Sequence, residues 1–205
     1  MQSRGSVVRI CLGSALALCC SSSGSGGVGG VPCSTGQLFI TPALQTKAEW
    51  YAKHFEAAGE RNLCESAATE NEVYRFTWLR TFHDPITIRI SKTSNGAVII
   101  AKRLDGSGGY APGTLAESRS RELSRADWLQ FQQLLQRLDY WSDAVPEDHE
   151  LGGLDGAQWI LEGVRGDTYR ALDRWSPERR TIMWNAGTFL LDKAEMLPED
   201  KALVY

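Results

Sequence analysis

The segment Leu154–Pro177, with the sequence LDGAQWILEGVRGDTYRALDRWSP, constrains the fold more than any other part of the chain. Aromatic and branched apolar residues mix with polar ones on both sides of Gly166-Asp167, as they do on half-buried strands. Two-residue hairpin turns favour this dipeptide, because its glycine can adopt a positive φ without a steric penalty. A turn here would pair Leu161 with Leu172. The segment therefore predicts a β-hairpin, and Ser176-Pro177 predicts that a helix starts directly after it.

Side chains of this hairpin are our candidates for a binding surface. In the expected register, Trp159 and Arg174 share the face of the leucine pair, whereas Glu162, Asp173 and Trp175 lie on the other face. Aromatic residues and arginine dominate binding hot spots, and charged side chains are costly to bury without a partner. The alternative is that the tryptophans belong to the core. The candidate binding residues are Trp159, Glu162, Arg170, Asp173, Arg174 and Trp175.

The same segment resembles a known family. The motif DGAQWILEG, followed by YRALDRWSP, is similar to a recurring pattern in a family of uncharacterised small bacterial envelope or secreted proteins. The resemblance extends from about Tyr74 to Leu191. This family carries no assigned activity, so the resemblance supports a domain boundary and implies nothing about mechanism.

The N-terminal residues have the composition of an export signal. Arg4 and Arg9 flank a short, positively charged N-terminal region, and the apolar stretch Ile10–Cys20 is too short to span a bilayer. A Gly/Ser-rich stretch follows and ends near residue 36. We therefore predict a signal peptide over residues 1–20 and a tether over residues 21–36.

Two types of export remain open. The leader resembles a bacterial lipoprotein signal, in which Cys20, or its neighbour Cys19, would carry the lipid. Ala15-Leu16-Ala17 also fits the cleavage site of ordinary secretion. The protein is therefore expected either on the periplasmic face of the cell envelope, held by a lipid anchor, or outside the cell.

Only two cysteines follow the leader, Cys33 and Cys64. An oxidising compartment would allow them to form a disulfide, which would stabilise the fold by about 3–4 kcal/mol through chain entropy. The alternative is one free thiol in the tether and one buried thiol. No cysteine or histidine pair has the spacing of zinc ligands, and we expect neither a metal nor a cofactor.

Hydrophobic periodicity predicts an α+β domain over residues 72–197. The element order β-β-β-β-α-β-β-α implies an antiparallel sheet with helices packed on one face. Ser124 and Asp127 form a capping-box-like start for the helix that follows the fourth strand. A helical N-terminal extension over residues 37–71 precedes the domain, with a helix from about residue 41 to residue 58.

Two glycine-containing turns join the early strands. A three-residue loop at Ser94-Asn95-Gly96 would align Ile90 with Ile100, and we prefer it because a one-residue slip moves an entire apolar face. The Gly-rich segment 105–113, DGSGGYAPG, is expected to be a flexible hairpin loop. It contains Ser107, but it lacks the context of a nucleophile or phosphate-binding loop.

Charge limits the classes of partner. The chain carries 22 Lys and Arg against 25 Asp and Glu, a net charge of −3, and without Arg4 and Arg9 the balance is 20 against 25, or −5. This acidic balance disfavours nucleic acid and anionic membrane surfaces. The acidic stretch 143–155 could bind calcium, but it lacks an EF-hand pattern. We interpret the tripeptide Arg165-Gly166-Asp167 as part of the hairpin turn rather than as a short integrin-binding motif.

The sequence favours a binding module over an enzyme. We expect an exported, lipid-anchored interaction module with an unknown protein partner, such as an inhibitor or immunity-type protein of the envelope, and we assign no catalytic residue. Its contact with a membrane would be through the lipid alone. The alternative is a small hydrolase in which His83 or His149 works with a carboxylate.

Overall fold

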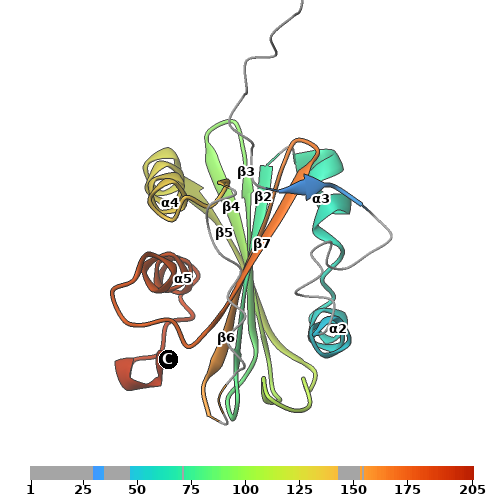
Figure 1. The fold of residues 1–205 in the computed structure, drawn as a ribbon, viewed down its shortest axis with the longest axis vertical. Coiled ribbons are helices and arrows are strands. Elements are labelled where there is room, and N and C mark those ends of the chain that lie inside the picture. Colours follow the sequence, from blue (N-terminus) through green and yellow to red (C-terminus); the bar gives the residue numbers. More distant parts are fainter. Residues whose placement is uncertain (1–29, 35–46, 71, 143–152, 154) are drawn as a thin grey trace, which may run out of the picture.

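The computed structural model describes residues 30–34, 47–70, 72–142, 153 and 155–205 (Figure 1). A seven-stranded sheet forms its centre, in the strand order β1-β7-β6-β2-β3-β4-β5, and every neighbouring pair is antiparallel. The expected α+β class with an antiparallel sheet is confirmed. The strands are β1 (Val31–Pro32), β2 (Glu72–Arg80), β3 (Ile86–Lys92), β4 (Gly96–Leu104), β5 (Leu115–Ser124), β6 (Ala157–Arg165) and β7 (Thr168–Trp175).

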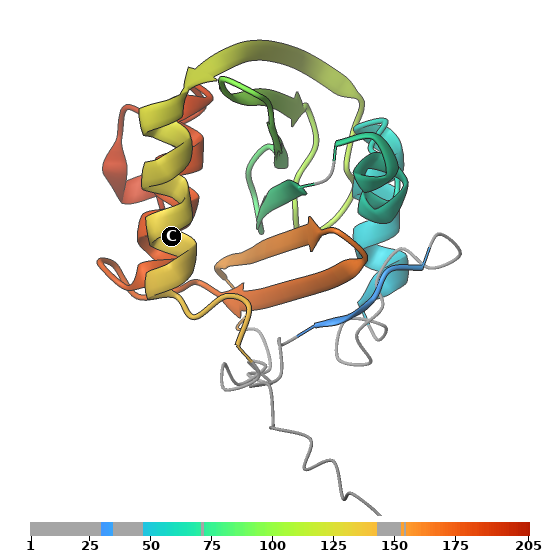
Figure 2. The ribbon, with the colours of Figure 1, turned by 90° about the horizontal axis from the view of Figure 1, so that it is seen from above.

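Helices cover both faces of the sheet (Figure 2). One face carries α4 (Arg125–Arg137) and α5 (Ile182–Lys193), and the opposite face carries α2 (Ala48–Ala57) and α3 (Leu63–Glu70). A short 3₁₀ helix, η1 (Lys201–Leu203), follows α5. The two helices of the predicted domain thus share one face, as expected, but helices of the N-terminal extension cover the other face, which the sequence did not predict.

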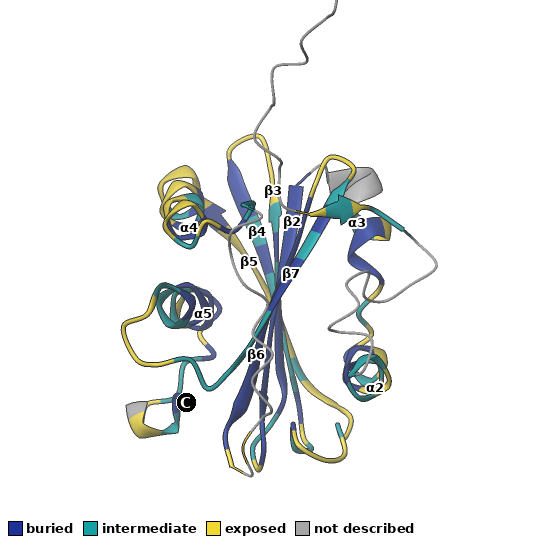
Figure 3. Ribbon diagram, in the orientation of Figure 1, coloured by how far each residue is buried: buried dark blue, intermediate teal, exposed yellow. Residues whose placement is uncertain are grey.

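The second covered face follows from the burial of the central strands on both sides (Figure 3). All nine residues of β2 are buried. Successive strand residues point to opposite faces, so Phe76 joins the apolar cluster beneath α4 and α5. Leu79 joins Tyr51 and Phe55 of α2 in a second cluster on the other face. α2 is thus part of the compact body, although it precedes the predicted domain range.

Two local predictions agree with the structure. Gly166 has a φ of 59°, and the β6–β7 hairpin pairs Leu161 with Leu172. The Ser124 side chain accepts a hydrogen bond from the Asp127 amide, and the Asp127 carboxylate accepts one from the Ser124 amide, which completes the capping box of α4. Both features depend on residues that are close in the chain, which is why the sequence predicts them.

The β3–β4 register differs from the predicted one. Ile90 lies opposite Ile99, one residue away from the expected Ile100. Gly96 does not close the turn: it is the first residue of β4 and pairs with Ser124 of β5. A Cβ at Gly96 would lie 2.2 Å from a carbonyl oxygen of β5. The close approach of the two backbones therefore requires this glycine in the sheet.

The helix predicted to start at Ser176-Pro177 begins later. α5 starts at Ile182, and its N-cap is Thr181, whose side chain accepts a hydrogen bond from the Trp184 amide. Ser176 has a positive φ of 39°, and its hydroxyl accepts the Ala157 amide at 2.9 Å. The serine therefore caps the start of β6 rather than a helix.

The Gly-rich loop at 105–113 is packed rather than flexible. The amide of Gly108 donates to the His83 carbonyl at 3.1 Å, and the amide of Gly109 donates to the Thr81 carbonyl at 3.2 Å. A Cβ at Gly108 would lie 2.6 Å from the backbone at the end of β2. The glycines allow the loop and this strand end to come into direct backbone contact.

The last residues of the chain close over the aromatic core. The backbone oxygen of Tyr205 accepts hydrogen bonds from the indole N–H of Trp78 at 3.1 Å and of Trp159 at 2.8 Å. Val204 is buried in the same cluster. The predicted boundary at residue 197 therefore excludes residues that belong to the core.

Candidate binding site

Two of the six candidate binding residues lie in the interior. Trp159 is fully buried and packs against Phe76 and Trp78 beneath α4 and α5. Glu162 is also fully buried. Because Glu162 lies on the other face of the sheet, as predicted, the hairpin does not present these two side chains on one surface.

Glu162 is held by a buried network that no sequence pattern predicted. Arg75 Nε donates to Glu162 Oε2 at 2.7 Å, Arg75 Nη2 donates to Oε1 at 2.8 Å, and the Tyr169 hydroxyl donates to Oε1 at 3.0 Å. Burial alone would lower the pKa of Arg75, but the Glu162 carboxylate raises it above its ordinary value. An arginine between the large apolar residues of a strand is a signal for such a pair, since a buried guanidinium requires an anion.

Asp173 connects the hairpin to α2. Its carboxylate accepts hydrogen bonds from Lys47 Nζ at 2.9 Å, from the Tyr51 hydroxyl at 2.9 Å and from the side chain of Gln158. Burial, followed by the charge of Asp173, raises the pKa of Tyr51. The position of Asp173 is therefore explained by the packing of the helix.

The other three candidates are half-buried. Arg174 Nη1 donates to the Asp173 carbonyl at 2.9 Å, and the carbonyl of Arg170 accepts the Tyr140 hydroxyl at 2.7 Å. The Trp175 ring lies so close to Gly156 that a Cβ there would be 2.5 Å from it. The glycine and the tryptophan of the family-like motif are thus packing partners.

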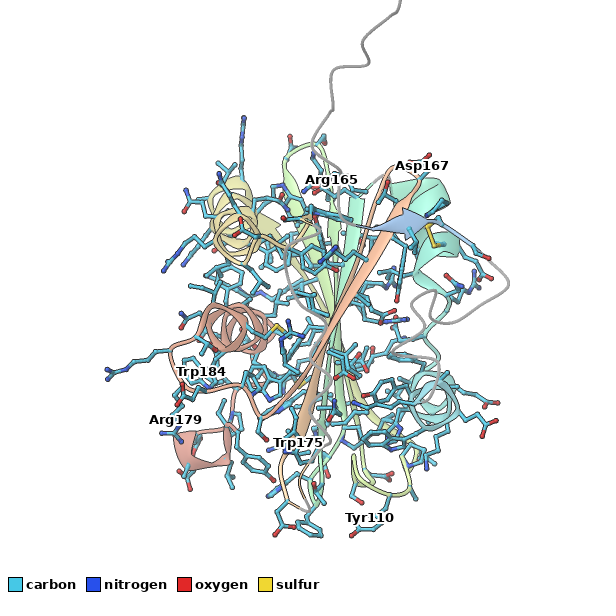
Figure 4. The ribbon with its side chains drawn as sticks, in the orientation of Figure 1. Tyr110, Arg165, Asp167, Trp175, Arg179 and Trp184 are labelled. Carbon is cyan, nitrogen blue, oxygen red and sulfur yellow. A yellow bond between two sulfur atoms is a disulfide. The ribbon has the colours of Figure 1, made fainter. Side chains whose placement is uncertain are left out.

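A cavity beside the hairpin lies at the C-terminal end of α4. It has a volume of about 580 Å³, which is within the usual range for ligand pockets. Figure 4 shows Arg165 and Trp175 at opposite ends of the hairpin, so Trp175 is remote from this pocket. The walls include Leu129, Gln132, Gln136, Tyr140, Trp141 and Arg165.

A hydrogen-bonded cluster holds the polar wall of this pocket. Arg165 Nη2 and Trp141 Nε1 each donate to the Tyr74 hydroxyl at 3.2 Å, and that hydroxyl donates to Glu72 Oε1 at 2.9 Å. Burial and the Glu72 carboxylate raise the pKa of Tyr74 to about 12, so its hydroxyl keeps its proton at neutral pH. The Arg165 guanidinium also lies 4.9 Å from the centre of the Trp141 ring.

No sequence pattern predicted this pocket. Arg165 was interpreted only as part of a turn tripeptide, and Trp141 was not among the candidate residues. The two residues are 24 positions apart, and only the return of β6 past the end of α4 brings them together. No local pattern predicts such a contact.

The described histidines do not form a pair with a carboxylate. The His83 ring nitrogen Nδ1 lies 2.8 Å from the Tyr205 hydroxyl, and burial, followed by the charge of Arg80, lowers the pKa of His83. The neighbouring Asp84 carboxylate accepts Arg103 Nη1 at 2.6 Å. His149, the other candidate for a hydrolase, lies outside the described residues, as do most of the acidic stretch 143–155 and the two candidate lipid-bearing cysteines, Cys19 and Cys20.

A disulfide joins Cys33, directly after β1, to Cys64 in α3, with 5.6 Å between their Cα atoms (Figure 4). Within the described part of the chain, no group of three or more His, Cys, Asp or Glu side chains is arranged to hold a metal ion. None of the helices described there is long and apolar enough to cross a membrane.

No family model matches the chain, and no curated protein is similar enough to count as a match.

Proposed function

We propose that the protein is an exported binding module of the bacterial envelope, anchored by a lipid on a leader cysteine. In this proposal it acts by stoichiometric recognition, as an inhibitor or immunity-type protein does. The Cys33–Cys64 disulfide supports export, because such bonds persist in oxidising compartments and are rare in the cytosol.

The observation that carries the binding function is the pocket beside Trp141 and Arg165. Tryptophan and arginine are enriched in binding hot spots. The Arg165 side chain is 48% exposed, yet Glu72 and Tyr74 already hold it in place. A partner that contacts Arg165 therefore immobilises little additional side-chain freedom, which favours tight association.

A charged side chain in the wall of the pocket should weaken partner binding without unfolding the protein. Leu129 is 50% exposed and lines the pocket. We expect Leu129→Asp to weaken partner binding at least tenfold, as the loss of an interface hot spot does, and to change the free energy of unfolding by less than about 0.5 kcal/mol. The measurement is affinity capture from the envelope of the source organism, followed by titration of the purified partner.

The matched control is Ala126→Asp, which adds the same charge to an exposed position of the same helix outside the pocket. It should bind as the wild type does. Equal affinity for wild type and Leu129→Asp would exclude the pocket as the recognition site.

The lipid anchor has its own test. Intact cells that express the full chain should incorporate a palmitate analogue into the protein, and Cys20→Ser combined with Cys19→Ser should remove the label. A single acyl chain anchors only marginally, so stable attachment requires more than one. Wild-type protein that is unlabelled and fully soluble would leave ordinary secretion as the route of export.

A further inference from the structure

A second exposed apolar surface lies at the opposite end of the sheet from the pocket. Among the residues that the structure describes, four large hydrophobic side chains are exposed, and three of them lie here. We call Phe82, Tyr110 and Leu115 the aromatic tip. Figure 4 shows Tyr110 at the far end of the molecule from Arg165. Side chains exposed in this way contribute little to the core, so their placement calls for another explanation.

The aromatic tip has a defined shape. The rings of Phe82 and Tyr110 stack with their centres 6.1 Å apart and their planes at 30°. The packed Gly-rich loop holds Tyr110 in this position. The Tyr110 amide donates to the Ser107 carbonyl at 3.1 Å, and Trp50 Nε1 of α2 donates to the Gly108 carbonyl at 3.1 Å. An arrangement that exists before binding lowers the entropic cost of association.

Three carboxylates lie at the same end of the sheet as the aromatic tip. Asp105 and Asp155 are exposed, and Asp84 is partly exposed beside its ion-pair partner Arg103. Asp155 belongs to this end of the sheet because the neighbouring Gly156 carbonyl accepts the Thr81 amide at 2.9 Å. A hydrogen bond from the Thr114 amide lowers the pKa of Asp105, so this carboxylate is ionised at neutral pH.

We propose that the aromatic tip docks into a protein partner whose apolar cleft is bordered by lysine or arginine side chains. Exposed aromatic rings contribute most to binding free energy when they are desolvated in such a cleft. The acidic rim, which consists of Asp84, Asp105 and Asp155, complements a basic border. The same rim disfavours an anionic lipid surface. This proposal concerns a second surface, separate from the pocket, and goes beyond the binding function proposed above.

The position at which the chain enters the domain also supports this proposal. The chain enters the domain at β1, where the Cys33 amide donates to the Asp167 carbonyl in the β6–β7 turn at 2.7 Å. This turn and Tyr110 lie at opposite ends of the molecule (Figure 4). A lipid anchor on the leader would therefore join the domain at the end remote from the aromatic tip, which leaves the tip free to meet a partner.

Site-specific photocrosslinking in intact cells tests this proposal with the full chain. A benzophenone amino acid replaces Tyr110, and in a matched strain it replaces Asp167, an exposed residue at the other end of the sheet. We expect a discrete adduct with one protein from position 110 and none from position 167. Adding Phe82→Ala should remove the adduct, and Phe82→Tyr should preserve it.

Titration of the purified partner completes the test. Phe82→Ala should weaken binding at least tenfold, Asp155→Asn should weaken it less, and added salt should lower the affinity. The proposal is overturned by any of four results: no adduct, an adduct with lipid, glycan or a second copy, equal adducts from both positions, or binding that is unchanged by Phe82→Ala. If Leu129→Asp weakens binding but the adduct from position 110 persists, the result supports the pocket as a separate binding site and leaves the proposal for the aromatic tip standing.

Discussion

Replacing Glu162 by alanine is expected to lower the free energy of unfolding by about 3–5 kcal/mol, because it leaves the Arg75 guanidinium buried without its anion. Both side chains are completely buried, and two hydrogen bonds of 2.7 and 2.8 Å join them. The nearest other carboxylate, Glu60, is 3.9 Å from Arg75 and also lies near Arg89 and Lys102. It therefore cannot fully replace Glu162. Urea denaturation of wild type and variant measures the difference.

Two controls make this experiment specific. The double replacement Arg75→Met with Glu162→Leu should recover much of the lost stability, because it removes both charges and keeps apolar volume. Glu117→Ala, which removes partly exposed ion pairs with Arg103 and Arg119, should have an effect of about 1 kcal/mol or less. If Glu162→Ala changed stability no more than Glu117→Ala does, the buried pair would not be a major determinant of the fold.

Removal of the disulfide should have a comparable effect. The bond between Cys33 and Cys64 closes a loop with a sequence separation of 31, so Cys33→Ser with Cys64→Ser should lower the free energy of unfolding by about 3–4 kcal/mol in the chain-entropy model. The first effect should be detachment of β1 and α3, which the bond connects across the edge of the sheet.

The reduced wild-type protein provides the control for this experiment. The melting temperature of the wild type in the presence of a reductant should match that of the double serine variant. The melting temperature of the variant itself should not change when the reductant is added. Identical melting of oxidised and reduced wild type would contradict the expected contribution of the bond.

The residues of the family-like motif serve the framework of the fold more than a binding surface. Gly156 accommodates Trp175, Glu162 pairs with Arg75, and Asp173 holds α2 through Tyr51. The two surfaces that we propose for binding are built largely from residues outside the motif. The motif residues therefore explain how the hairpin is packed and leave the function unspecified.

The sequence alone determined the local elements. The dipeptide Gly166-Asp167 and the alternation around it predicted the hairpin and its register, and Ser124 with Asp127 predicted the start of α4. These features depend on backbone preferences and on contacts between neighbouring residues. The antiparallel α+β class followed from the same short-range patterns.

Tertiary structure decided which faces are covered and which charges meet. β2 is buried on both sides because α2 packs beneath it, and Glu162 finds Arg75 across 87 positions of sequence. The β3–β4 register also depended on β5, which approaches Gly96 too closely for any side chain. A strand's own sequence shows that a face is apolar, but what covers that face depends on segments that are distant in the chain and meet only when the sheet assembles.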